Sequence, residues 1–193
     1  MHKQNPKVAA RVTQAMRTLP RDHFVEMSTP SLVLGRSMMP SALKRRMNFE
    51  TIHPIKSVED EIGVVIREAE KALKASGVDV QPDEDIIRAL VVIFHELRNG
   101  QSLDGRSTDR LASAVMSTAE AVSVAHAMGV YAYYYREGSM LAEDFTDFLV
   151  GAAIKDNSAD LKRMSHYFET EVAHKQGDVW QIIYQRWQES FRF

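Results

Sequence analysis

The sequence predicts a mainly α-helical protein, in which a bundle of helices follows a short mixed α/β segment. Two observations predict this fold class. From about residue 57 onward, apolar residues recur at helical spacing and are separated by capping residues, glycines and prolines. Before residue 54, two short β-prone stretches flank a loop and a short helix instead. We place the boundary between the two parts at Pro54–Ser57.

The first part begins with a predicted helix. Asn5 can cap this helix, and Pro6 suits its first position because a proline lacks the N–H that would have no partner there. A β-prone piece follows at His23–Met27. A strand is predicted at Asn48–His53, where apolar and polar residues alternate, and Pro54 ends it.

The second part is predicted to be helical to its end. Ser57-Val58-Glu59-Asp60 resembles a capping box, and the helix behind it ends near Gly77. The next helix begins at Pro82–Asp85 and is apolar nearly all round, which predicts a central, buried helix. Further helices are expected at residues 107–127 (with a break near 116–117), 131–138, 142–154, 158–174 and 178–192.

Composition excludes several classes of function. The 193 residues carry a net charge of −2, which gives no general attraction to nucleic acid or to an anionic membrane. The chain has no cysteine, and its seven histidines lack the spacing of paired metal ligands, so no metal site is predicted. The polar start and the short apolar runs lead us to expect a cytoplasmic protein without a membrane span.

Four tyrosines near the middle of the helical part raise the question of a stacking platform for single-stranded nucleic acid. They are Tyr131, Tyr133, Tyr134 and Tyr135. Because no lysine or arginine is interleaved with them, we interpret them as core and helix-packing residues.

The most informative motif is Pro-Ser-Ala-Leu-Lys-Arg-Arg-Met-Asn-Phe at residues 40–49. Proline opens a short helix, and Lys44, Arg45 and Arg46 occupy its last turn, where the helix dipole favours cations. The dipole does not explain two adjacent arginines. Their planar, forked guanidinium groups suit phosphate oxygens better than lysine does.

This motif resembles the SSALKRRFNF box of MoxR-type AAA+ ATPases, which carries the arginine finger that reaches the nucleotide of the neighbouring subunit. The resemblance covers roughly residues 24–175. It implies a partial AAA+ core at residues 1–54, a helical lid domain at 55–175 and a C-terminal amphipathic helix at 176–193. It also implies that Arg46, with Arg45 beside it, is a catalytic arginine finger that acts in trans.

Other nucleotide-binding elements of that family are missing. Residues 100–107 read G-x-x-x-x-G-R-S, but Arg106 replaces the lysine of a P-loop, and the residues before it have helical spacing. We interpret this stretch as a loop between helices. No strand ending in Mg²⁺-binding acids precedes the arginine box. The chain is therefore not expected to hydrolyse ATP alone or to hold a cofactor, and ATP and Mg²⁺ would be met only through a partner subunit.

Two further segments extend the resemblance. Met116–Ser123 is similar to the LSTAEAIS segment at the start of the lid helix that carries sensor 2. Where other branches have a phosphate-contacting arginine, this chain has Ala119 and Glu120, so no nucleotide-binding residue is assigned. Residues 144–156 resemble the GLVGAVVKD helix end of the same branch.

Two functional hypotheses follow. In the first, the chain is a partial MoxR-like AAA+ module that supplies an arginine finger and lid contacts to partner AAA+ subunits, in a homo- or hetero-oligomer. In the second, it is a helical interaction module derived from a lid, without a nucleotide role. Its partner would then be another protein, bound through the aromatic C-terminal helix, which carries Trp180, Ile183, Tyr184, Trp187 and Phe191. That helix could equally dock on the bundle.

Overall fold

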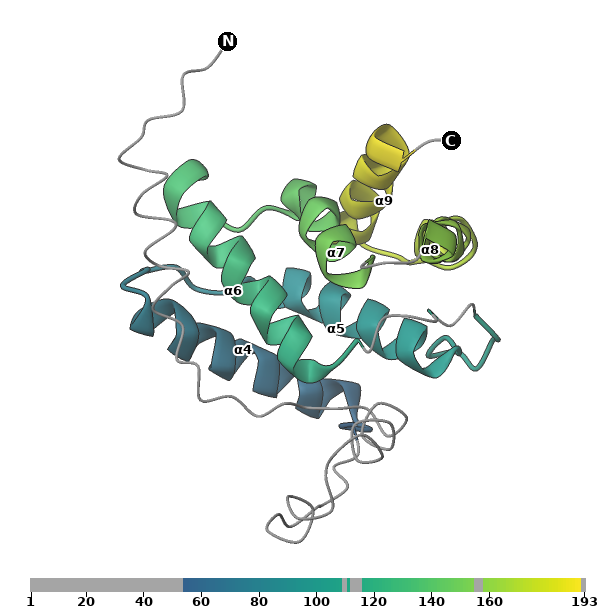
Figure 1. The fold of residues 1–193 in the computed structure, drawn as a ribbon, viewed down its shortest axis with the longest axis horizontal. Coiled ribbons are helices and arrows are strands. Elements are labelled where there is room, and N and C mark those ends of the chain that lie inside the picture. Colours follow the sequence, from purple (N-terminus) through teal and green to yellow (C-terminus); the bar gives the residue numbers. More distant parts are fainter. Residues whose placement is uncertain (1–53, 109–110, 112–115, 155–157, 192–193) are drawn as a thin grey trace, which may run out of the picture.

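The computed structural model describes residues 54–108, 111, 116–154 and 158–191 (Figure 1). This part is mainly helical and contains no strand, which confirms the predicted fold class for the bundle. Its elements are α4 (Val58–Ala75), α5 (Glu84–Asn99), α6 (Thr118–Tyr135), the 3₁₀ helix η1 (Ala142–Asp144), α7 (Phe145–Ala153), α8 (Ser158–Thr170), the 3₁₀ helix η2 (Val172–His174) and α9 (Asp178–Phe191). The predicted helix, strands and arginine box before residue 54 lie outside the described residues.

The first two helices begin where their local sequence predicts. The Ser57 hydroxyl caps α4 by accepting a hydrogen bond from the Asp60 N–H at 3.2 Å. The Asp83 carboxylate caps α5 in the same way, accepting from the Ile86 N–H at 3.0 Å. Gly100 ends α5 in the left-handed conformation, with φ of 69°, which glycine adopts without strain.

Helix α6 differs from the prediction. Two helices were expected, at residues 107–127 and 131–138, but one continuous helix runs from Thr118 to Tyr135. Its start coincides with the break expected near 116–117, whereas Ser107 forms a β-bridge with Gln101 instead of opening a helix. The region that was expected to separate the helices contains Gly129. A Cβ at this position would lie 2.7 Å from Leu73 Cδ2, so the glycine lets α6 lie close against α4.

The helices form two groups around a shared core. Helices α4 and α6 lie side by side and run in the same direction, since Glu61 lies next to Thr118 and Leu73 next to Gly129. Figure 1 shows α4 on one side of α5 and α6, and α7, α8 and α9 on the opposite side. Helix α5 lies centrally, with Leu90, Phe94 and Leu97 fully buried, as its all-round apolar sequence predicts.

The C-terminal helix docks on this bundle. Ile183 and Trp187 of α9 are buried in the core, and the Trp187 ring stacks on Phe168 of α8 with 4.1 Å between centroids. The outward face of α9 is polar, with Gln181 and Gln185 exposed. None of the described helices is long and apolar enough to cross a bilayer.

Candidate functional site

The first turn of α6 is the part of the described chain that the sequence resemblance links to nucleotide. Ser117 and Glu120 form a reciprocal capping box there. The Ser117 hydroxyl accepts from the Glu120 N–H at 3.2 Å, and the Glu120 carboxylate accepts from the Ser117 N–H at 2.9 Å. Met116 precedes it with φ of 52°, a conformation that L residues seldom adopt. The turn is therefore sharply defined by its own sequence.

A buried ion pair fixes this turn to two other helices. The Arg98 guanidinium of α5 donates to both carboxylate oxygens of Glu61 on α4, at 3.1 and 2.8 Å. The Thr118 hydroxyl of α6 donates to Glu61 Oε1 at 2.8 Å, and Arg98 also donates to the Met116 carbonyl at 2.9 Å. Both charged side chains are buried. Bidentate geometry and added hydrogen bonds are what a buried pair needs to offset its loss of hydration.

A second buried carboxylate, Glu96, joins α5 to the elements that follow it. Its Oε2 accepts a hydrogen bond from the Tyr167 hydroxyl of α8 at 2.5 Å, and its Oε1 accepts from Lys175 Nζ at 2.9 Å. The Leu103 N–H also donates to Oε1, at 3.0 Å. Burial, with the neighbouring Glu96 charge, raises the pKa of Tyr167 well above its ordinary value. Tyr167 therefore stays a neutral hydrogen-bond donor.

The loop at residues 100–107 is a closed turn rather than a phosphate cradle. It follows helix α5, as interpreted from the sequence, and not a strand. Its amide groups are used within the protein, because Ser102 N–H donates to the Arg106 carbonyl at 2.8 Å and Arg106 N–H donates to the Ser102 hydroxyl at 3.1 Å. The Arg106 guanidinium pairs with Glu171 at 2.9 Å. The loop thus helps hold the bundle together.

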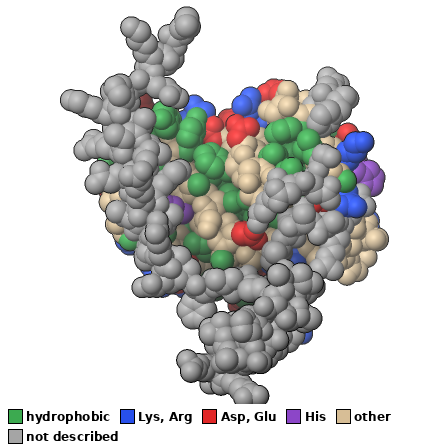
Figure 2. All heavy atoms as spheres, in the orientation of Figure 1, with side chains coloured by type: hydrophobic (Ala, Val, Ile, Leu, Met, Phe, Trp, Pro, Cys, Tyr) green, Lys and Arg blue, Asp and Glu red, His purple; other side chains and the backbone are tan. Residues whose placement is uncertain are grey.

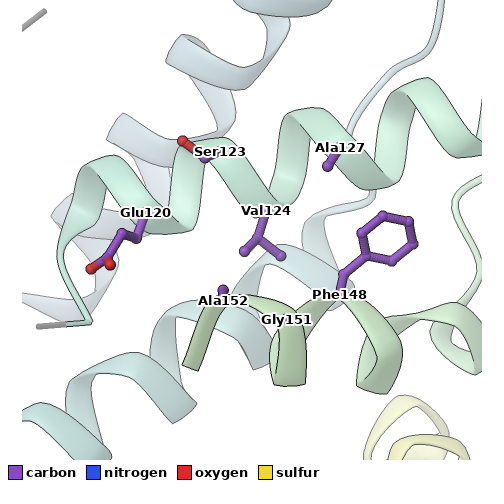
Figure 3. Close-up of a pocket in the computed structure, with 7 residues that line it drawn as sticks. All are labelled: Glu120, Ser123, Val124, Ala127, Phe148, Gly151 and Ala152. Carbon is purple, nitrogen blue, oxygen red and sulfur yellow. The ribbon is translucent and has the colours of Figure 1, made fainter. Parts of the chain in front are cut away.

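A shallow groove lies between α6 and α7, beginning at the first turn of α6. Its volume is about 280 Å³, and most of its lining side chains are small or apolar: Glu120, Ser123, Val124, Ala127, Phe148, Gly151 and Ala152. Figure 3 shows Val124 and Phe148 pointing into the space between the helices, with Glu120 at the end nearest the start of α6. This lining suits an apolar group and offers no cation to a phosphate.

The site residues predicted from sequence are only partly described. Arg45 and Arg46 lie outside the described residues, so their role stays a prediction. Ala119 and Glu120 lie in the first turn of α6, and Arg98, a described cation that reaches this turn, is bound to Glu61. Within the described ranges, no three histidine or acidic side chains come together as metal ligands.

The sequence reasoning did not single out the buried polar residues Glu61, Glu96, Arg98 and Tyr167. A signal for two of them was present. Glu96 and Arg98 lie in a helix that is apolar nearly all round, and a charge on such a helix must be paired when it is buried. The sequence does not identify the partners, because Glu61 lies 37 residues from Arg98 and Tyr167 lies 71 residues from Glu96.

Comparison with known proteins supports the resemblance to the C-terminal part of an AAA+ ATPase. Residues 59–190 match the model of a family described as YehL-like AAA+ ATPase C-terminal domain. The chain is also 37% identical over 152 residues to a protein of Escherichia coli strain K12 that is called "Uncharacterized protein YehL". The match covers 78% of this chain and 41% of that protein, so the chain spans less than half of the relative's length. No solved structure matches.

Proposed function

This chain belongs to the YehL-like AAA+ ATPase C-terminal domain family, and we propose that it supplies an arginine finger and a lid to a partner AAA+ subunit. In this proposal Arg46, flanked by Arg45, reaches ATP that the partner holds with Mg²⁺. The observation that carries the proposal is the family match over residues 59–190, which begins shortly after the arginine box at residues 40–49. We also propose that the box is of the MoxR type, which the family match over residues 59–190 does not address.

The first described residues, which follow the box in the sequence, are attached to the bundle. His95 of α5 forms a hydrogen bond through Nε2 to the Lys56 carbonyl at 3.3 Å, immediately before the Ser57 cap. The start of α4 is also the end that touches the start of α6, through Glu61 and Thr118. Lys56 and Ser57 therefore lie at the end of the bundle that also holds the first turn of α6, the turn that the resemblance to a lid associates with nucleotide.

In this proposal the arginine box, and not the first turn of α6, contacts the phosphates of ATP. At the start of α6, Arg98 is engaged by Glu61 and the Glu120 carboxylate completes a capping box, so neither is arranged to bind a phosphate. A finger arginine stabilises the charge that develops on the γ-phosphate, an effect of roughly 10³–10⁵ in rate in other NTPases. The lid would contribute contacts between subunits.

A mixing experiment with the Escherichia coli relative tests the proposal. Full-length YehL would be combined with this chain as wild type, Arg46→Ala and Lys44→Ala, and ATP turnover would be measured. We expect the wild-type chain and Lys44→Ala to raise turnover, and Arg46→Ala to raise it far less. Lys44→Ala is the matched control because it removes one cation from the same motif, two residues from Arg46. Equal rates with wild type and Arg46→Ala would rule out the finger role.

A second candidate, an interaction module without a nucleotide role, is favoured by the capping role of Glu120. By the resemblance to MoxR-type lids, a phosphate-contacting arginine would be expected in this turn, where this chain has the capping Glu120. This candidate predicts that the chain binds its partner with the same affinity with or without ATP, and that Arg46→Ala changes neither binding nor turnover. Isothermal titration of the same pair of proteins, with and without nucleotide, separates the two candidates.

A further inference from the structure

The C-terminal end of α6 exposes aromatic side chains that were expected to be packed. Tyr133 and Tyr135 are 43% and 54% exposed, and Leu141 on the following turn is also exposed. The interpretation as core and helix-packing residues is therefore wrong for Tyr133 and Tyr135, whereas Tyr134 packs against the core. Tyr131 and Tyr135 stack with 4.9 Å between ring centroids, and Tyr131 meets Phe148 of α7 edge-on at 5.6 Å. The exposed rings are held by neighbouring rings on the protein.

The surroundings of these rings are acidic. Glu137, Glu143 and Asp147 are exposed on the turn after α6 and the start of α7. Two cations lie nearby and both are paired: Arg136 donates two hydrogen bonds to Asp144 at 2.8 and 2.7 Å, and Arg186, which donates to the Glu143 carbonyl at 3.2 Å, pairs with Glu189. In the part of Figure 2 that corresponds to the loop between α6 and α7 in Figure 1, acidic side chains lie beside hydrophobic and basic ones.

The protein already places a guanidinium on this surface. The guanidinium carbon of Arg136 lies 5.6 Å from the centre of the Tyr131 ring while its nitrogens bind Asp144. This arrangement combines a cation–π contact with a paired carboxylate, and it uses the planar shape that distinguishes arginine from lysine. Tyr135, stacked on Tyr131, presents a further ring, and Glu137 and Glu143 provide further carboxylates nearby.

We propose that this aromatic–acidic face, made of Tyr131, Tyr135, Glu137 and Glu143, docks an arginine-bearing segment of a partner protein. Exposed tyrosine rings favour a partner over water, and tyrosine is common where proteins meet. The negative charge around the rings selects a cationic partner and disfavours a nucleic acid, whose phosphates would be repelled. The inference goes beyond the proposed finger role and does not depend on it, because it uses the far end of α6.

A defined cationic probe tests the face on the full chain. Fluorescein-labelled hexa-arginine amide would be titrated with the protein and followed by fluorescence anisotropy at low and at physiological salt. A hexacitrulline peptide of the same length is the neutral control, and a ten-nucleotide thymidine strand is the nucleic-acid control. We expect saturable binding of hexa-arginine that weakens with salt, and no binding of the other two probes.

Variants of the face locate the binding. Tyr135→Ala and Glu137→Gln/Glu143→Gln should each weaken hexa-arginine binding, by about two- to fivefold for each ring or charge removed, whereas Tyr133→Ala, on the other side of α6, should not. Tyr135→Phe should retain binding, because the ring remains. The matched control, Asp104→Asn/Glu169→Gln, removes two exposed charges from the loop after α5 and from α8 and should have no effect. Circular dichroism would show that each variant keeps its helices.

Several results would overturn the proposal. Equal weakening by the control pair would mean that the probe responds only to overall charge. Equal binding of hexacitrulline would remove the role of the cation, and tyrosine-dependent binding of the thymidine strand would identify a nucleic-acid surface instead. Failure of hexa-arginine to bind at low salt would also refute it.

Discussion

The two ends of α6 differ in their surroundings: the start is held by buried polar contacts, and the end carries exposed aromatic side chains. At its start, Thr118 is bound into a buried network with Glu61 and Arg98, and a capping box closes the turn. At its end, Tyr133 and Tyr135 stand exposed, Tyr135 beside acidic side chains. The start is fixed by directional polar contacts to two other helices, whereas the end leaves surface uncovered. The start therefore helps to hold the fold in place, whereas the end is the surface that we propose for a partner.

Breaking the network at the start of α6 should give the largest effect on stability. Glu61→Gln keeps the size of the side chain but leaves the Arg98 guanidinium buried without a counter-charge. We expect the free energy of unfolding to fall by about 3–5 kcal/mol, as measured by urea denaturation. Glu68→Gln, in an exposed pair with Lys71, is the control and should change stability little.

A double variant sharpens this prediction. In Glu61→Gln/Arg98→Met, no charge remains buried in this network, so much of the lost stability should return. If the single variant were as stable as wild type, the network would not anchor α6.

The close approach of α6 to α4 gives the next largest effect. In Gly129→Ala the new methyl group would lie 2.7 Å from Leu73 Cδ2, and we expect a loss of about 1–3 kcal/mol in thermal or urea unfolding. Gly151→Ala on α7 is the matched control, since nothing lies within 4 Å of its Cβ position. Because alanine favours a helix more than glycine does, the control should be neutral or slightly stabilising. Equal effects of the two substitutions would contradict the close approach.

The smallest effect concerns pH. His126 is buried on α6, with its Nε2 3.0 Å from the Ser76 hydroxyl, and burial lowers the pKa of His126 below its ordinary value of 6.5. In the unfolded chain the imidazole takes up a proton near pH 6.5, whereas in the folded protein it does so only at lower pH. The contribution of His126 to stability is therefore complete above pH 6.5 and is lost as pH falls towards the lowered folded pKa.

Urea titrations at pH 5.5 and 7.5 check this. Wild type should be less stable at the lower pH, and His126→Gln should reduce that difference. An unchanged pH difference in the variant would assign the effect to other groups.

Local sequence predicted some elements well and others poorly. The bounds of α4 and α5 could be predicted because Ser57, Asp83 and Gly100 act within one turn of the helix ends. The continuity of α6 could not be predicted, because the reason for Gly129 within the helix is its close packing against Leu73 of α4, a residue far away in the sequence. The network around Glu61 joins residues 37 and 57 positions apart, and spacing along the chain carries no signal for such pairs. The role of Arg45 and Arg46 as an arginine finger remains a prediction from sequence.

The most direct test of the central proposal is ATP turnover in a mixture of this chain with full-length Escherichia coli YehL. The relative would be held at constant concentration while the wild-type chain or Arg46→Ala is added in increasing amounts. The account predicts that turnover rises with the wild-type chain and rises far less with Arg46→Ala. Identical titration curves for the two proteins would contradict it.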